Sequence, residues 1–280
     1  GRLPLLVKQG YRGRILATAA TCELAAIILR DSAKIQEEDH ARDMRKALRA
    51  GREAEIAPPL YTAADVEATI ERFSAVGFDR PLALSDDVRV TYRQAGHILG
   101  SAYLEIDAEG GRITFSGDLG NRESSLHPPA VPPSSSDVIV LESTYGDRLH
   151  RSREATQAEF LSVVRSAVAR GGNVMIPTFA VERAQQVLYE LYHLISRGAL
   201  ADLPVYLDSP MATSVTKLYQ KGIDELRDEV ADVFEAGGDP FDPPSLTFTP
   251  DAESSKKLND VHGGAVIIAA SGMMTGGRIL

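Results

Sequence analysis

A histidine and an aspartate stand at the same end of a predicted β-hairpin. Residues 101–107 and 112–116 each have the alternating pattern of a strand, and a tight-turn signal lies between them. With the turn centred there, antiparallel pairing puts Asp118 opposite Ser101, and His97 lies just upstream of Ser101. Glycines flank both residues. An imidazole and a carboxylate held together in loops are the groups from which catalytic metal sites are built.

Neither residue taken alone is specific evidence for a metal site. A single histidine in a Gly-rich loop is a structural or surface residue in roughly three cases of four, and an aspartate after a strand is ordinary turn chemistry. The pattern recurs, however, because Glu142, Asp208 and Ser271 also follow apolar strand-like segments. Polar groups at the carboxyl ends of buried strands are typical of α/β sites.

The elements that must position these residues predict an α/β fold. In the first half we expect a helix at 3–7, a short strand at 14–17 and an apolar helix at 24–29. Residues 31–55 are predicted to form either a solvated helix or a mobile excursion. A further helix is expected to begin at the capping box Thr62–Asp65 and to end at Gly77. A continuous apolar strand is expected at 137–141. From about Thr156 onward, apolar strands alternate with helices, which favours a parallel sheet covered by helices. Its strands are expected at 173–176, 205–207 and 265–269, with one helix starting from a capping box at Thr156–Glu159 and another over 184–195.

Five motifs together carry a family resemblance. They are Ala95-Gly-His-Ile-Leu-Gly-Ser-Ala102, Phe115-Ser-Gly-Asp-Leu-Gly120, Leu141-Glu-Ser-Thr-Tyr-Gly-Asp-Arg148, Ile176-Pro-Thr-Phe-Ala-Val-Glu-Arg183 and Ile268-Ala-Ala-Ser-Gly-Met-Met-Thr-Gly-Gly277. In order and content they resemble the β-CASP branch of metallo-β-lactamase-fold RNA nucleases, which includes the pre-mRNA 3′-end cleavage endonuclease and its prokaryotic relatives. The resemblance implies a partial metallo-β-lactamase αββα sandwich over residues 1–153 and a β-CASP domain with a mainly parallel sheet over residues 154–280.

The resemblance also implies roles for three residues in a site with two zinc ions. His97 matches a ligand of the first zinc, Asp118 matches the carboxylate that bridges both metals, and Glu142 matches an acidic residue that supports the site. In such a site a metal-bound hydroxide attacks an RNA phosphodiester while the two cations neutralise the developing charge. Asp118 and Glu142 are therefore the predicted catalytic residues.

The chain departs from the family pattern at both ends. The His-x-His-x-Asp-His signature, which supplies four ligands, is absent, and Gly1-Arg-Leu-Pro4 resembles the residues that follow it. The run ending at Leu280 resembles the residues before two further family histidines. We therefore expect a fragment of a longer protein that retains two of seven ligands, binds zinc weakly and is inactive by itself.

Further residues are candidates for RNA contact. Backbone N–H groups of the Gly-rich loop at Ser271, Gly272, Thr275 and Gly276 could hold phosphate before a following helix, although an unliganded connection is equally compatible. Arg183 could contact phosphate, but an ion pair with Glu142 or Asp208 is the preferred interpretation. A basic cluster (Arg148, His150, Arg151, Arg153) could line an RNA path or form a solvated loop, and for Tyr145 core packing is preferred over base stacking.

The composition of the chain limits its expected partners and location. The 280-residue chain has a formal charge of −9, so RNA would need a local basic patch or metal ions. A single cysteine excludes a disulfide framework, and the sequence shows no signal peptide or membrane-length apolar run, which favours a cytoplasmic protein without membrane attachment. The expected partner is RNA, and a homodimer is possible. Two rivals stay open: a hydrolase of the same fold acting on DNA or another ester, and a non-catalytic RNA-binding subunit.

Overall fold

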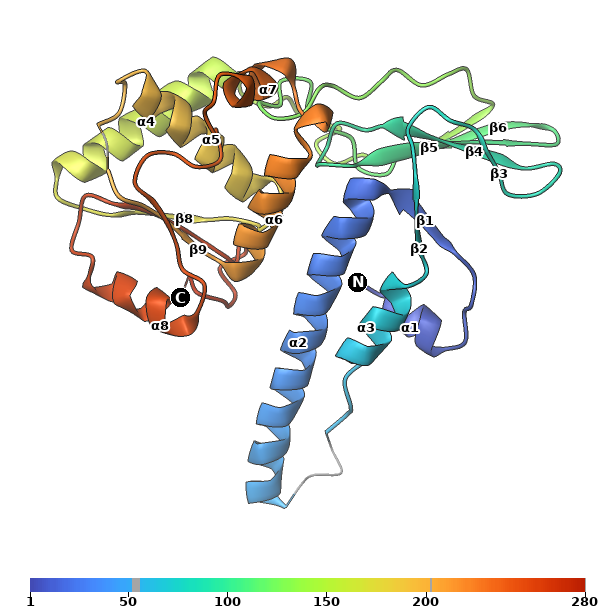
Figure 1. The fold of residues 1–280 in the computed structure, drawn as a ribbon, viewed down its shortest axis with the longest axis horizontal. Helices are drawn as coiled ribbons and strands as arrows, with labels where there is room; N and C mark the ends of the chain where they lie inside the picture. The colour runs from blue at the N-terminus through green and yellow to red at the C-terminus, as the bar shows by residue number, and fades with distance from the viewer. Residues whose placement is uncertain (52–55, 202, 280) are drawn as a thin grey trace. The chain divides into compact units, whose positions relative to one another are not determined.

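The computed structural model describes residues 1–51, 56–201 and 203–279 (Figure 1). The chain separates into two compact units, residues 1–77 and residues 78–280. The predicted domain boundary after residue 153 falls inside the second unit and stays a prediction.

The first unit is built on a long helix and a two-stranded parallel sheet. Its elements are α1 (Leu3–Lys8), β1 (Ile15–Thr18), α2 (Ala19–Ala50), α3 (Ala63–Ile70) and β2 (Phe73–Val76). A small core of Leu29, Ala33, Tyr61 and Val66 joins α2 to α3. The predicted capping box is present, since the Thr62 hydroxyl accepts from the N–H of Asp65 while the Asp65 carboxylate accepts from that of Thr62.

The predicted extension of this helix to Gly77 is wrong. The helix ends at Ile70, and residues 73–76 form β2, which pairs in parallel with β1 from Ile15↔Phe73 onward. Hydrogen bonding to a strand nearly sixty residues upstream overrides the local helical pattern, a pairing that periodicity within one segment cannot reveal.

The second unit begins with a five-stranded mixed sheet. Its strands lie in the order β3-β4-β5-β6-β7, namely Leu82–Ala83, Arg89–Gln94, Ala102–Ala108, Gly111–Phe115 and Val138–Val140. All neighbours are antiparallel except β6 and β7. The predicted hairpin is confirmed: Leu104 pairs with Phe115, and continuing this register places Ser101 opposite Asp118. Strand β7 is at the edge, and all three of its residues are exposed.

A second, four-stranded sheet follows, and it is entirely parallel, as predicted. Its order is β10-β9-β11-β8, formed by Leu246–Phe248, Val205–Asp208, Val266–Ala269 and Val174–Pro177. Around it lie α4 (Arg153–Ala169), α5 (Arg183–Ser196), α6 (Pro210–Lys221), α7 (Asp228–Glu235) and α8 (Ala252–Lys257), with short 3₁₀ turns η2 (Ile223–Glu225) and η3 (Leu258–Asp260) (Figure 1). Buried aliphatic residues of β9, β11 and α5 form the main core. The predicted α/β class is confirmed.

Helix α4 begins earlier than predicted. Its N-cap is Ser152, whose hydroxyl accepts from the N–H of Ala155 at 3.3 Å. Thr156 lies inside the helix, and its hydroxyl donates to the Ser152 carbonyl at 3.0 Å. The expected capping box at Thr156 is therefore wrong, because two hydroxyl residues four positions apart compete for the cap and the upstream one takes it.

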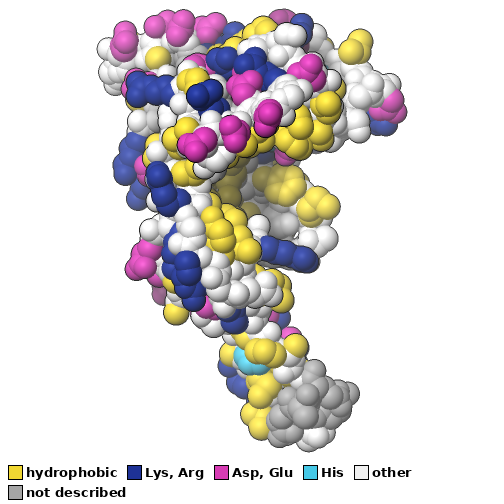
Figure 2. All heavy atoms as spheres, turned by 90° about the vertical axis from the view of Figure 1, so that its right-hand side faces the viewer, with side chains coloured by type: hydrophobic (Ala, Val, Ile, Leu, Met, Phe, Trp, Pro, Cys, Tyr) yellow, Lys and Arg dark blue, Asp and Glu magenta, His cyan; other side chains and the backbone are white. Residues whose placement is uncertain are grey.

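The surface mixes both signs of charge. Figure 2 shows Lys and Arg side chains next to Asp and Glu, with exposed hydrophobic side chains between them on the face drawn. Among the described residues, no helix is both long and apolar enough to cross a membrane.

Candidate active site

The loop carrying His97 is folded around one hydroxyl. The Ser101 Oγ accepts hydrogen bonds from the N–H groups of His97 at 2.9 Å and of Ile98 at 3.2 Å. Gly96, with φ of 64°, makes the turn that leads from β4 into this loop. These contacts fix the backbone at His97 and leave its side chain 43% exposed.

The loop carrying Asp118 lies directly against the first one. The N–H of Gly120 donates to the Ala95 carbonyl at 2.9 Å. A Cβ atom added at Gly120 would lie only 1.7 Å from the Gly96 carbonyl oxygen, so no side chain fits at this position. This close backbone approach brings the two candidate ligands to one place.

His97 and Asp118 meet as the hairpin geometry predicts. The distance from His97 Nε2 to Asp118 Oδ2 is 3.9 Å, and the Asp118 side chain is 78% exposed. This distance is too long for a hydrogen bond, but it suits two groups that would each bind a metal ion at roughly 2.1 Å. Within residues 1–51, 56–201 and 203–279, no group of three or more His, Cys, Asp or Glu side chains is placed to hold a metal ion. His97 and Asp118 therefore fit as two members of a larger set of metal-binding side chains.

Glu142 holds the Asp118 loop from the end of β7. Its Oε1 accepts from the N–H of Leu119 at 2.8 Å, and its own N–H donates to Ser116 Oγ at 2.9 Å. The pKa of Glu142 lies below its ordinary value, chiefly because of the Leu119 N–H, with smaller contributions from Thr144 and from the nearby His97. The Glu142 carboxylate therefore fixes the backbone of the residue after Asp118 and lies near the His97 imidazole.

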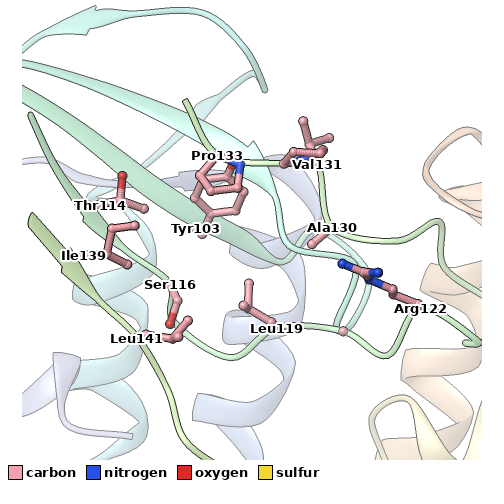
Figure 3. Close-up of a pocket in the computed structure, with 12 residues that line it drawn as sticks. Tyr103, Thr114, Ser116, Leu119, Arg122, Ala130, Val131, Pro133, Ile139 and Leu141 are labelled. Atoms are coloured by element: carbon pink, nitrogen blue, oxygen red, sulfur yellow. The ribbon is translucent and has the colours of Figure 1, made fainter. Parts of the chain in front are cut away.

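A cavity of about 300 Å³ opens beside this loop (Figure 3). Ser116 and Leu119, which lie close to Asp118 in the chain, line it together with Tyr103 of β5 and Ile139 of β7, and Arg122 adds a positive side chain to the lining. Figure 3 shows an otherwise mostly apolar wall.

Asp208 and the Gly-rich loop form a separate cluster. The buried Asp208 carboxylate, at the end of β9, accepts from Arg278 Nη1 at 2.8 Å, from the Thr249 hydroxyl at 2.5 Å and from the Ser255 hydroxyl at 2.7 Å. Arg278 also donates to the Thr249 carbonyl, which ties the loop that starts at Ser271 to the sheet. The sequence reasoning missed this use of Arg278, because its partner lies 70 residues upstream.

The phosphate-binding candidates differ in surroundings. Ser271 makes a local turn, with its Oγ accepting from the N–H of Met273 at 3.3 Å, and Thr275 is exposed, whereas Gly272 and Gly276 are half-buried. Residues 271–279 form turns, and the helix expected after this loop is not seen in the part described. These residues lie in one loop, and their role stays a prediction.

Two predictions are wrong: the ion pair of Arg183 and the core packing of Tyr145. Arg183 is exposed, and no ion pair of its side chain occurs among the described residues, because Asp208 pairs with Arg278 and Glu142 with backbone N–H groups. Tyr145 is 55% exposed rather than packed in the core. Its positive φ of 57° turns the ring outward against His150, at 4.6 Å between ring centroids.

The basic cluster is neutralised by acidic neighbours. Arg148 pairs with Asp147, Arg151 with Glu159 and Arg153 with Glu190. A run of cations in the sequence is therefore a set of ion pairs in space, which weakens it as a patch for RNA.

The sequence of this chain matches a known domain and is similar to known proteins. A model of the Beta-Casp domain matches residues 184–280. Over the whole chain, Ribonuclease TTHA0252 of Thermus thermophilus is 40% identical, and Cleavage and polyadenylation specificity factor 73 of Drosophila melanogaster is 31% identical over 99% of the chain. Residues 184–280 thus match the Beta-Casp domain, and the chain as a whole is similar in sequence to these proteins.

A further relative is the Transcription termination factor FttA of Pyrococcus abyssi, which is 31% identical over 99% of the chain. The chain spans 60% of the Thermus protein's length, 38% of the Drosophila protein and 41% of the Pyrococcus protein. The mixed sheet, the parallel sheet and their covering helices agree with the predicted β-CASP and metallo-β-lactamase architecture.

Proposed function

We propose that this protein is a zinc-dependent β-CASP nuclease that hydrolyses RNA phosphodiester bonds. The observation that carries the proposal is the pairing of His97 with Asp118 at 3.9 Å, in a chain 40% identical to a protein named as a ribonuclease. An imidazole and a carboxylate that converge without bonding one another are suited to share a cation.

His97, Asp118 and Glu142 would each have a different role in this site. His97 would hold one zinc ion through Nε2, and Asp118 would hold both ions of the site through its carboxylate. When bound, two zinc ions would supply the positive charge that activates water and neutralises the phosphodiester. Glu142 keeps the Asp118 loop in place through the N–H of Leu119 and places a negative charge near the His97 imidazole.

The decisive experiment is Asp118→Ala in the full-length protein. Loss of groups that merely support metal ligands costs about 10–100-fold in activity or affinity, so loss of a ligand should reduce RNA cleavage by more than about 100-fold and lower the zinc content. The fold should survive, because the Asp118 side chain is 78% exposed. Cleavage of labelled RNA, metal analysis and circular dichroism measure the three effects.

Asp86→Ala is the matched control, since Asp86 is an exposed aspartate in the turn before β4. It should leave cleavage and zinc content unchanged. Full cleavage with normal zinc in Asp118→Ala would refute the proposal. The rival substrates are separated by offering DNA and RNA of the same sequence to the same preparation, and a non-catalytic RNA-binding subunit would bind RNA without cleaving it.

A further inference from the structure

A buried hydrogen-bond network joins the loop carrying His97 to helices α5 and α6. The hydroxyl of Tyr219, a fully buried residue of α6, accepts a hydrogen bond from the N–H of Leu99 at 3.2 Å. The same hydroxyl donates to Glu182 Oε2 at 2.6 Å. Leu99 lies two residues after His97, so the network ends inside the loop of the candidate ligand.

The Glu182 carboxylate is the anchor of this network. It also accepts from Gln186 Nε2 at 2.7 Å and meets the ring Nε2 of His127 at 2.7 Å. A carboxylate oxygen accepts, so in this contact His127 donates through Nε2. With three donors fixing its oxygens, Glu182 orients the Tyr219 hydroxyl proton toward itself and leaves that oxygen free to accept from Leu99.

The backbone at Glu182 is strained. Its φ of 69° and ψ of −60° are those of a γ-turn, closed by the N–H of Arg183 donating to the Val181 carbonyl at 2.9 Å. A residue other than glycine in this conformation persists only where its surroundings over-determine it. Here the surroundings are the three contacts of its carboxylate, all directed to side chains of the network.

The segment from α6 to η2 holds the same loop at two further points. The carboxyl of Glu225, whose pKa is raised by burial, hydrogen-bonds the N–H of Gly100. The Leu99 side chain is fully buried against Gly222, where an added Cβ would lie 3.0 Å from its Cδ1. Two consecutive amides of the His97 loop are thus held by groups more than one hundred residues away.

We propose that Tyr219 and Glu182 are positioning residues for His97: a relay from the Glu182 carboxylate through the Tyr219 hydroxyl to the Leu99 N–H fixes the loop that presents the imidazole. The catalytic consequence rests on the proposed function, since it requires His97 to bind the metal. The relay makes the parallel-sheet region of the chain part of the metal site's support.

The test begins with Tyr219→Phe in the full-length protein, which removes the hydroxyl and keeps the ring. Amide hydrogen exchange at Leu99 should become at least about 10-fold faster, and Zn²⁺ affinity, measured by competition with a chromogenic chelator, should fall about 10-fold. Tyr189→Phe is the matched control, because Tyr189 is also a buried tyrosine but makes an edge-to-face contact with His193 on α5. It should change neither readout.

Substitutions at Glu182 separate the carboxylate from the backbone. Glu182→Gly accepts the positive φ readily but removes the acceptor, so a merely structural turn predicts unchanged exchange at Leu99, whereas the relay predicts faster exchange. Glu182→Gln retains one carbonyl acceptor and should restore part of the protection. Wild-type exchange at Leu99 in both Tyr219→Phe and Glu182→Gly would overturn the relay.

His97→Ala distinguishes this proposal from the proposed function. If His97→Ala leaves zinc affinity and RNA cleavage unchanged, the nuclease assignment fails, and with it the role of the relay in positioning a ligand. If His97→Ala loses zinc while Tyr219→Phe and Glu182→Gly bind it as the wild type does, the nuclease assignment stands and the positioning role is overturned.

Discussion

At the scale of single residues, the candidate site depends on glycine as much as on its polar groups. The imidazole of His97 and the carboxylate of Asp118 approach only because two loops touch backbone to backbone. Gly120 makes this contact possible, since any Cβ there would overlap the carbonyl of Gly96. A glycine with no chemistry of its own therefore decides the distance between the two candidate ligands.

Gly120→Ala tests this point. We expect a loss of at least about 2 kcal/mol in the free energy of unfolding, because a Cβ atom 1.7 Å from the Gly96 oxygen forces the loops apart. Urea denaturation measures the loss. Gly276→Ala is the control, as a Cβ at Gly276 meets nothing within 4 Å. Equal stability of the two variants would contradict the close approach.

At the scale of elements, the β4–β5 pair owes part of its stability to a buried acid. Glu105 on β5 is 1% exposed, accepts from the N–H of Ser134 at 2.7 Å and pairs with Arg93 of β4 at 3.0 Å. Burial alone would raise the pKa of Glu105, but the Ser134 N–H and the Arg93 guanidinium outweigh it and hold that pKa below its usual range. The carboxylate thus fastens the connection before β7 onto the sheet.

The pH dependence follows from the direction of this shift. Because the folded-state pKa is below the unfolded value of about 4.3, Glu105 stabilises the fold at all pH values above that, and its contribution is lost as the pH falls toward the folded-state pKa. Glu105→Gln should cost about 1–3 kcal/mol at pH 7, since Arg93 is partly exposed and screened. The variant should also lose less stability than wild type between pH 5 and pH 3.

Urea unfolding at several pH values measures both effects. Glu109→Gln, at the exposed hairpin turn, is the control and should behave as wild type. An unchanged pH profile in Glu105→Gln would show that the carboxylate is not the group that titrates.

At the scale of the whole molecule, the exposed edge of the five-stranded sheet stands out. Val138, Ile139 and Val140 of β7 are 51%, 52% and 50% exposed. By register, Val138 and Val140 share a face with Ile113 and Phe115 of β6, which are also exposed. An apolar edge strand with free hydrogen-bonding groups is a template for association with another strand.

We therefore expect residues 1–280 alone to self-associate through β7. Ile139→Lys should shift the population toward monomer in light scattering after size-exclusion chromatography, because charge on an edge strand opposes pairing. Leu84→Lys is the matched control, since Leu84 is 53% exposed but lies outside this edge. The expectation fails if both substitutions change the mass distribution alike.

The sequence by itself determined the hairpin register, the α/β class, the parallel strands and the motifs around His97 and Asp118, because these follow from local periodicity, turn chemistry and short motifs. Only the tertiary structure decided that residues 73–76 form a strand, that Arg278 pairs with Asp208, and that Tyr219 reaches Leu99 across 120 positions. Each of these three contacts joins groups that are far apart in the chain. Tertiary packing brings such groups together, and the local sequence around either group does not encode the contact.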